Sequence, residues 1–290
     1  MYMLSKHIPC INPFLFCVCY GGILKTTPMD DPKFIDGIFN YCDRWCERCY
    51  FTSRCRVFEQ AGQLTPEEMD ISNKKFWDTL SKNLSEAKEL LHQAGEKHGF
   101  DIEKLTKTEF QEFEKDQKRT RKKIKDTELE RLNQEYIKVA NDWLKNNDHI
   151  REIQKDVLQQ MSLGIQSDEK MLFYVQTIKD CLEIVRWYLY MIAVKFNRAL
   201  SGKLEDDGWE EANGFQKDSD GSAKVALLSA KRTFDAWLKL FELLPNEEQN
   251  LIPILGILQK ILKKGEEDFP NAKNFIRPGF DEPPVSGFKV

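Results

Sequence analysis

The strongest constraint on the fold is the spacing of apolar residues, which recurs every three or four positions along most of the chain. Segment 168–201 shows this best, since Val, Ile, Trp and Tyr residues cover most of its circumference. A helix that is apolar on most faces should lie at the centre of a bundle. The 290 residues contain no convincing strand-like alternation and no internal repeat. The sequence therefore predicts an all-α protein: a single multi-helix bundle with a cysteine-rich segment packed on it.

Local signals divide the chain into four parts. Residues 1–28 form an apolar stretch interrupted by prolines, which we interpret as a non-native or disordered leader. Residues 29–64 form the cysteine-cluster segment, and residues 65–264 form the helical bundle. Residues 265–290 hold four prolines and should form an extended tail.

Capping signals predict where several helices begin and end. Thr65 and Glu68 have the spacing of a capping box, which should open a helix with an apolar stripe. Gly99 should end that helix, and Gly265 should end the last one. Ser222 should open the helix before it, with Asp218–Gly221 as a turn and cap.

Composition excludes few classes of partner. The near balance of 43 basic and 47 acidic residues gives no reason to expect nucleic acid or an anionic membrane. The longest apolar run, residues 187–194, is far shorter than the roughly 20 residues of a membrane helix. We therefore expect no membrane association, and we leave the oligomeric state open.

Four of the eight cysteines lie within fourteen residues. They are Cys42, Cys46, Cys49 and Cys55. One interpretation makes them ligands of a single metal centre, in a reducing and therefore cytoplasmic compartment. The other makes them the small apolar face of a buried helix, because the first three have helical spacing. Nearby arginines favour the metal, since they would stabilise the negative charge of thiolates. These arginines are Arg44, Arg48, Arg54 and Arg56.

A compact run of this kind favours an iron–sulfur centre. Structural zinc usually takes two well-separated cysteine pairs, so we expect a [4Fe–4S] cluster first and zinc as the alternative. Cys42, Cys46 and Cys49 are spaced like the motif of radical S-adenosylmethionine enzymes. The loop from Cys46 to Cys55 resembles the cluster loop of CRISPR-associated and recombination exonucleases. Neither resemblance implies an activity here, because the barrel pattern and the strand-borne nuclease residues are missing.

A longer resemblance covers most of the chain from Met29. The N-terminal "YCDRWCERC" and the C-terminal "FIRPGFDE" together resemble a set of bacterial all-helical proteins without an assigned activity. This resemblance implies a shared helical fold and no particular reaction.

Three functions follow from the cysteine cluster. The first is redox or electron transfer, with an unknown redox or protein partner, and whether it is enzymatic is left open. The second is a non-enzymatic binding module whose metal staples the N-terminal segment to the bundle. The third, association with nucleic acid, depends only on the nuclease-like loop and the basic run Lys118–Lys123.

Other polar patterns have simpler explanations. Glu89 and His92 have the spacing of a di-iron ligand pair but lack the second pair, so we expect them to face solvent. The basic run Lys118–Lys123 lacks interleaved aromatic residues, so we expect a solvated helix face. Segment 168–201 also carries a polar stripe that should face solvent or form ion pairs, with Cys181 beside it as a packing residue. The stripe consists of Gln176, Lys179, Asp180, Glu183 and Arg186.

Overall fold

The computed structural model of the chain describes residues 31–62, 64–98, 107–145 and 168–281, together with residues 155, 159 and 163. All regular secondary structure in these ranges is helical, as the apolar spacing predicted. The predictions for residues 1–28 and for the end of the tail lie outside the described residues.

The chain divides into two compact units. The loop unit contains residues 1–39 and 46–115, and the bundle unit contains residues 40–45 and 116–290. Helix α5 (Lys107–Lys125) contributes residues to both. In this division residues 65–115 group with the cysteine segment, and residues 116–264 belong to the bundle unit.

Among the described residues, the helices that lie wholly in the loop unit are α2 (Arg56–Ala61), α3 (Pro66–Met69) and α4 (Lys74–His98). The predicted capping box opens α3: the Glu68 N–H donates to Thr65 Oγ1 at 3.4 Å, and the Thr65 N–H donates to Glu68 Oε2 at 2.8 Å. The chain then breaks before α4, because Asp70 Oδ1 accepts the N–H of Ser72 at 2.9 Å and forms a turn. Helix α4 is described as far as His98, so the prediction that Gly99 ends it lies outside the described residues.

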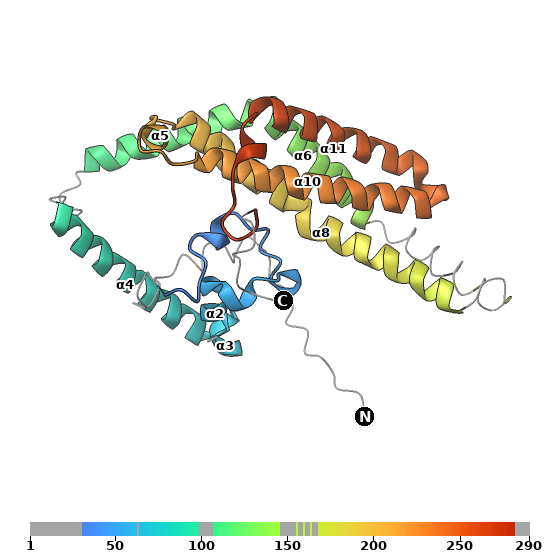
Figure 1. The fold of residues 1–290 in the computed structure, drawn as a ribbon, viewed down its shortest axis with the longest axis horizontal. Helices are drawn as coiled ribbons and strands as arrows, with labels where there is room; N and C mark the ends of the chain where they lie inside the picture. Colours follow the sequence, from blue (N-terminus) through green and yellow to red (C-terminus); the bar gives the residue numbers. More distant parts are fainter. Residues whose placement is uncertain are drawn as a thin grey trace. The chain divides into compact units, whose positions relative to one another are not determined.

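In the described part of the bundle unit, four long helices pack together. They are α6 (Glu128–Lys145), α8 (Asp168–Leu204), α10 (Asp218–Leu243) and α11 (Glu248–Asp268), coloured from green to red in Figure 1. Helix α8 packs against α6 and α10, and α11 packs against the same two helices. Each helix therefore has two neighbours, which closes a four-helix arrangement around one core.

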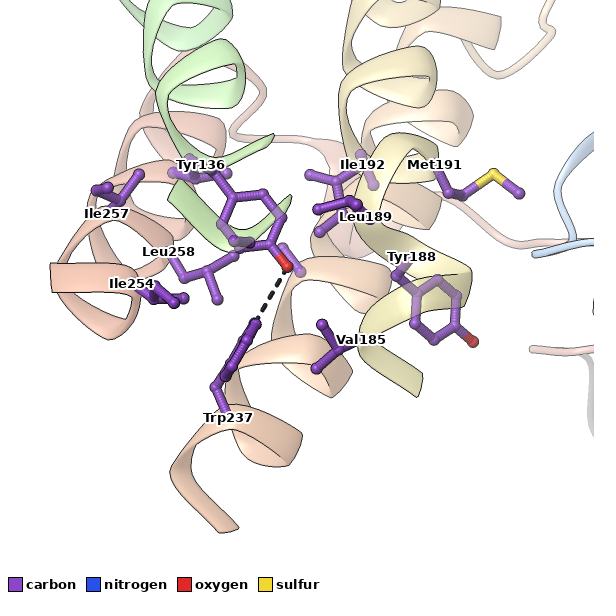
Figure 2. Close-up of a cluster of buried hydrophobic side chains, with 14 of the residues drawn as sticks. Tyr136, Val185, Tyr188, Leu189, Met191, Ile192, Trp237, Ile254, Ile257 and Leu258 are labelled. Carbon is purple, nitrogen blue, oxygen red and sulfur yellow. Dashed lines mark hydrogen bonds between the residues drawn. The ribbon is translucent and has the colours of Figure 1, made fainter. Parts of the chain in front are cut away.

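The core of the bundle unit lies between these helices (Figure 2). Tyr136 of α6 and Trp237 of α10 are almost fully buried, and the Trp237 Nε1–H donates to the Tyr136 hydroxyl at 3.2 Å. Val185 of α8 packs beside them and is 0% exposed. Segment 168–201 therefore faces the core as one of four helices and not at their centre, and Leu172 and Phe173 in its first turns are 66% and 75% exposed.

Two predicted boundaries in the bundle unit are wrong. Helix α10 begins at Asp218 rather than at Ser222, so Asp218–Gly221 is its first turn and not a separate cap. Helix α11 continues through Gly265 to Asp268. A Cβ atom at position 265 would lie 2.6 Å from Cζ of Phe196. Gly265 therefore allows close packing and does not end the helix.

The C-terminal segment folds back onto the start of α10. A short 3-10 helix, η6 (Ala272–Asn274), follows α11 and packs against α10. Beyond it, Asp281 receives a bidentate contact from Arg277 at 2.9 and 3.0 Å and an ion pair from Lys224 at 2.8 Å. Burial raises the pKa of the Asp281 carboxyl, but the hydrogen bonds from Arg277 and Lys224 outweigh burial and hold this pKa well below its usual range.

Candidate metal centre

The cysteine segment is a series of tight turns and not a continuous helix. Its regular elements are the 3-10 turns η1 (Ile38–Asn40), η2 (Cys46–Arg48) and η3 (Thr52–Arg54). Gly37 and Arg44 have φ angles of 70° and 59°, which an α-helix cannot contain. The prediction that Cys42, Cys46 and Cys49 share one helical face is therefore wrong, and the buried-helix interpretation loses its premise.

Three of the candidate ligands lie in the loop unit on consecutive turns. The Cys49 N–H donates to the Cys46 carbonyl oxygen at 3.1 Å, which closes the turn between these two residues. The N–H of Phe51 donates to Cys49 Sγ at 3.4 Å. Cys55 follows η3 in extended backbone (φ −107°, ψ 112°) and precedes α2. All three side chains are half-buried.

Cys42 belongs to the bundle unit and has a similar local environment. The N–H of Arg44, whose positive φ turns the chain back, forms a hydrogen bond with the Cys42 sulfur. Burial is the largest influence and raises the pKa of the Cys42 thiol overall, although Arg44 and the Lys195 ammonium oppose this rise. The Lys195 side chain is itself buried, with only 7% of the residue exposed, and donates to the Asn40 carbonyl oxygen at 3.1 Å.

The basic residues around the cysteines are distributed differently from the prediction. Arg44 does act on Cys42, but Arg56 is buried against the ring of Phe34, 4.9 Å from its centroid. Arg48 and Arg54 are exposed. Sequence reasoning missed Lys195, although a single Lys within the apolar run Met191–Phe196 was a signal for a buried charge that needs a partner.

The five described cysteines are all in the thiol form. Within the described ranges, no three side chains of His, Cys, Asp or Glu form a group that could hold a metal ion. The convergence of Cys42, Cys46, Cys49 and Cys55 on one metal therefore stays a prediction. What the structure adds is the backbone around each cysteine: short turns, with N–H donors directed at two of the sulfurs.

The polar stripe of α8 faces solvent. Gln176 is exposed and donates to Asp180 at 2.9 Å, which is the ordinary pairing of a surface helix. Cys181 lies behind it in the core at 6% exposure, so its interpretation as a packing residue is confirmed. Burial and the neighbouring Asp180 raise the pKa of the Cys181 thiol, so the thiolate form of this residue is disfavoured.

The remaining sequence candidates are surface features. Glu89 is exposed and accepts a hydrogen bond from Gln93 at 3.3 Å on its own helix. In the basic run on α5, Arg119 is exposed and pairs with Asp116 at 3.0 Å, one turn away. Glu89 and Arg119 therefore face solvent as predicted, whereas His92 is half-buried.

Comparisons with protein-family models, with curated proteins and with solved structures gave no match to this chain. Among the helices that the structure describes, none is long and apolar enough to cross a membrane, in agreement with the short apolar runs of the sequence.

Proposed function

We propose that Cys42, Cys46, Cys49 and Cys55 bind one metal centre, with a [4Fe–4S] cluster as the first candidate and zinc as the alternative. The main support for this proposal is a pair of backbone N–H donors directed at sulfur. Arg44 supplies the donor at Cys42, and Phe51 supplies the donor at Cys49. A backbone N–H directed at sulfur stabilises a thiolate, which is the form that ligates metals.

The chain around these sulfurs fits a negatively charged metal–thiolate centre. The left-handed conformation of Arg44 costs about 1 kcal/mol and turns the chain directly after the N–H that bonds to the Cys42 sulfur. Strain of this kind concentrates at functional sites. The ammonium of Lys195 adds a buried positive charge that opposes the rise in the pKa of the Cys42 thiol caused by burial. Four thiolates would make the site strongly negative, so this cation would offset part of that charge.

A bound [4Fe–4S] cluster would supply one-electron transfer, and a zinc ion would supply only cross-linking. In either case the thiolates hold the metal, and the N–H donors together with Lys195 stabilise the charge. We therefore propose electron transfer as the function if the metal is an iron–sulfur cluster. The alternative is a structural staple that ties the cysteine turns to the chain around Cys42.

Anaerobic purification followed by analysis of iron, labile sulfide and zinc tests this proposal. A cluster should give about four irons and four sulfides per chain and a reversible bleaching of its colour by dithionite. One tightly held zinc per chain would keep the site and refute electron transfer. A chain with neither metal, purified and reconstituted without oxygen, would refute the metal centre.

Single Cys→Ser variants assign the ligands. Serine at Cys42, Cys46, Cys49 or Cys55 should each reduce metal content or make the centre labile to chelators. Cys181→Ser is the matched control, because Cys181 is buried in the bundle core, and this variant should retain full metal content. Equal metal loss in the control would show that the variants act by unfolding the chain.

A further inference from the structure

Residues 40–45, which we call the docking segment, are held against α8 by hydrogen bonds to their backbone. Lys195 Nζ donates to the Asn40 carbonyl oxygen at 3.1 Å, and Trp187 Nε1–H donates to the Asp43 carbonyl oxygen at 3.0 Å. Both donors belong to α8, and the two bonds lie on either side of Cys42. The backbone that carries this cysteine is therefore fixed by the bundle itself.

The side chain of Asp43 adds a charged anchor. Its Oδ2 accepts hydrogen bonds from the Tyr188 hydroxyl at 2.6 Å and from Arg232 at 2.7 Å, and Arg232 also donates to the Tyr188 hydroxyl at 2.9 Å. In Figure 2, Tyr188 points away from Tyr136 and Trp237, so its hydroxyl lies outside the aromatic core. Charge-assisted bonds of this length are among the stronger ones in proteins.

Aromatic stacking holds the end of the docking segment. The rings of Trp45 and Trp187 are stacked, with centroids 5.1 Å apart and an interplanar angle of 15°. Tyr188 meets Trp45 edge to face at 5.9 Å. Such pairs add about 0.5–1.5 kcal/mol each beyond the area that they bury.

Tyr41 holds the other end through the first turn of α10. Its hydroxyl donates to Asp218 Oδ1 at 2.9 Å, and Arg198 binds the same carboxylate at 2.6 and 3.2 Å. The Tyr41 ring contacts the ring of Phe275 with centroids 4.6 Å apart. A Cβ atom at Gly221 would overlap the Tyr41 ring and lie 2.6 Å from Cζ of Phe275. Only glycine leaves room for both rings at that position.

These contacts bring two distant sequence motifs together in the structure. Tyr41 opens the N-terminal cysteine motif, and Phe275 opens the C-terminal motif "FIRPGFDE". Phe275 is 5% exposed, and Gln216 exchanges two hydrogen bonds with the backbone of Ile276 at 2.7 and 3.2 Å. The C-terminal motif therefore forms one wall of the space that the Tyr41 ring occupies.

We infer that the bundle positions Cys42 as a ligand before any metal binds, and that Gly221 and Asp43 are the positioning residues that make this docking possible. The consequence of this docking, tighter retention of the metal, rests on the proposed function. The docking itself depends on contacts of the metal-free chain. A ligand held in place in advance loses less conformational entropy when the metal binds.

Hydrogen exchange of the metal-free, reduced full-length chain tests the docking without reference to a metal. Peptides covering residues 40–45 should be protected in the unsubstituted chain. In Gly221→Ala they should exchange at least about tenfold faster, because the added methyl group displaces the Tyr41 ring. Gly256→Ala is the matched control, since nothing lies within 4 Å of its Cβ position, and it should leave the exchange of these peptides unchanged.

Asp43→Asn provides a second test that adds no bulk. It keeps the size of the side chain and removes the charge that pairs with Arg232, so residues 40–45 should again exchange faster. If residues 40–45 of the unsubstituted chain exchange as fast as an unstructured peptide, the inference is wrong. Unchanged exchange in both Gly221→Ala and Asp43→Asn would also overturn it.

Release of metal to a chelator then tests the consequence. Gly221→Ala and Asp43→Asn should release the metal at least about tenfold faster than the unsubstituted chain and than Gly256→Ala, as expected when a ligand is no longer held in place. Equal release rates would overturn the positioning role. Absence of metal from the unsubstituted chain would instead refute the proposed function and leave the exchange result standing, so the two failures are distinguishable.

Discussion

Replacing Gly265 by alanine tests how closely α8 and α11 pack. In an ordinary helix interior this change stabilises the fold by about 1 kcal/mol, because glycine loses more backbone entropy on folding than alanine. At Gly265 the new Cβ would lie 2.6 and 2.9 Å from two ring carbons of Phe196 and 3.0 Å from Cδ2 of Leu227. Carbon atoms attract best at about 3.5–4.0 Å, so the methyl group would be about 1 Å too close.

The neighbouring ring has little room to move away. Phe196 is 0% exposed, and its ring lies against that of Phe269 with centroids 6.5 Å apart. Overpacking a well-filled core costs about 1–3 kcal/mol. This cost exceeds the gain in helix propensity, so we expect Gly265→Ala to lower the free energy of unfolding by about 1–2 kcal/mol.

Gly256→Ala serves as the control because it lies in the same helix with nothing within 4 Å of its Cβ position. It should raise the free energy of unfolding by up to about 1 kcal/mol. Urea unfolding followed by tryptophan fluorescence measures both variants, since every tryptophan except Trp77 lies in the bundle unit. In a Phe196→Leu background, Gly265→Ala should lose its penalty. Stabilisation of the original chain by Gly265→Ala would refute the close-packing argument.

Three further outcomes follow from the bundle unit. Tyr136→Phe should lower the free energy of unfolding by about 1–3 kcal/mol, because the buried Nε1–H of Trp237 loses its acceptor; a neutral effect in urea unfolding would show that another acceptor replaces it. Val185→Asp should cost several kcal/mol or prevent folding, whereas Val194→Asp on the same helix, 37% exposed, should cost far less in thermal melts. Asp281→Asn should lower the melting temperature at pH 7. The pKa of the Asp281 carboxyl is lower in the folded chain than in the unfolded chain, where it is about 4, so the carboxylate stabilises the fold above pH 4 and progressively less below it. The melting temperatures of the unsubstituted chain and of Asp281→Asn should therefore converge as the pH falls below about 4.

Features that depend on neighbouring residues in the sequence were predicted well. The capping box at Thr65 and Glu68 forms as its spacing indicated. The apolar period identified segment 168–201 as a helix, and Val185 of this helix is buried in the bundle core. Each of these signals is carried within a few turns of one helix, so no knowledge of the rest of the fold was needed.

The cysteine segment shows where local reasoning failed. Phe34, Ile35, Ile38 and Phe39 have helical spacing, yet their backbone forms turns. The N–H of Ile35 donates to the carbonyl oxygen of Arg54 at 3.1 Å, a partner nineteen positions away that the apolar pattern does not reveal. Four cysteines within fourteen residues remain the reason to propose a metal, and that proposal came from composition rather than from the fold.

The sequence by itself determined the helices, their main apolar faces and the candidate ligands, because side-chain period and residue type are local properties. Only the tertiary structure decided the roles of Gly221, Gly265 and Lys195. A glycine that ends a helix and one that admits a neighbouring ring look the same in the sequence, and α10 and α11 continue through both of these glycines. The difference lies in the Tyr41 and Phe196 rings that pack over them, brought from segments far away in the chain.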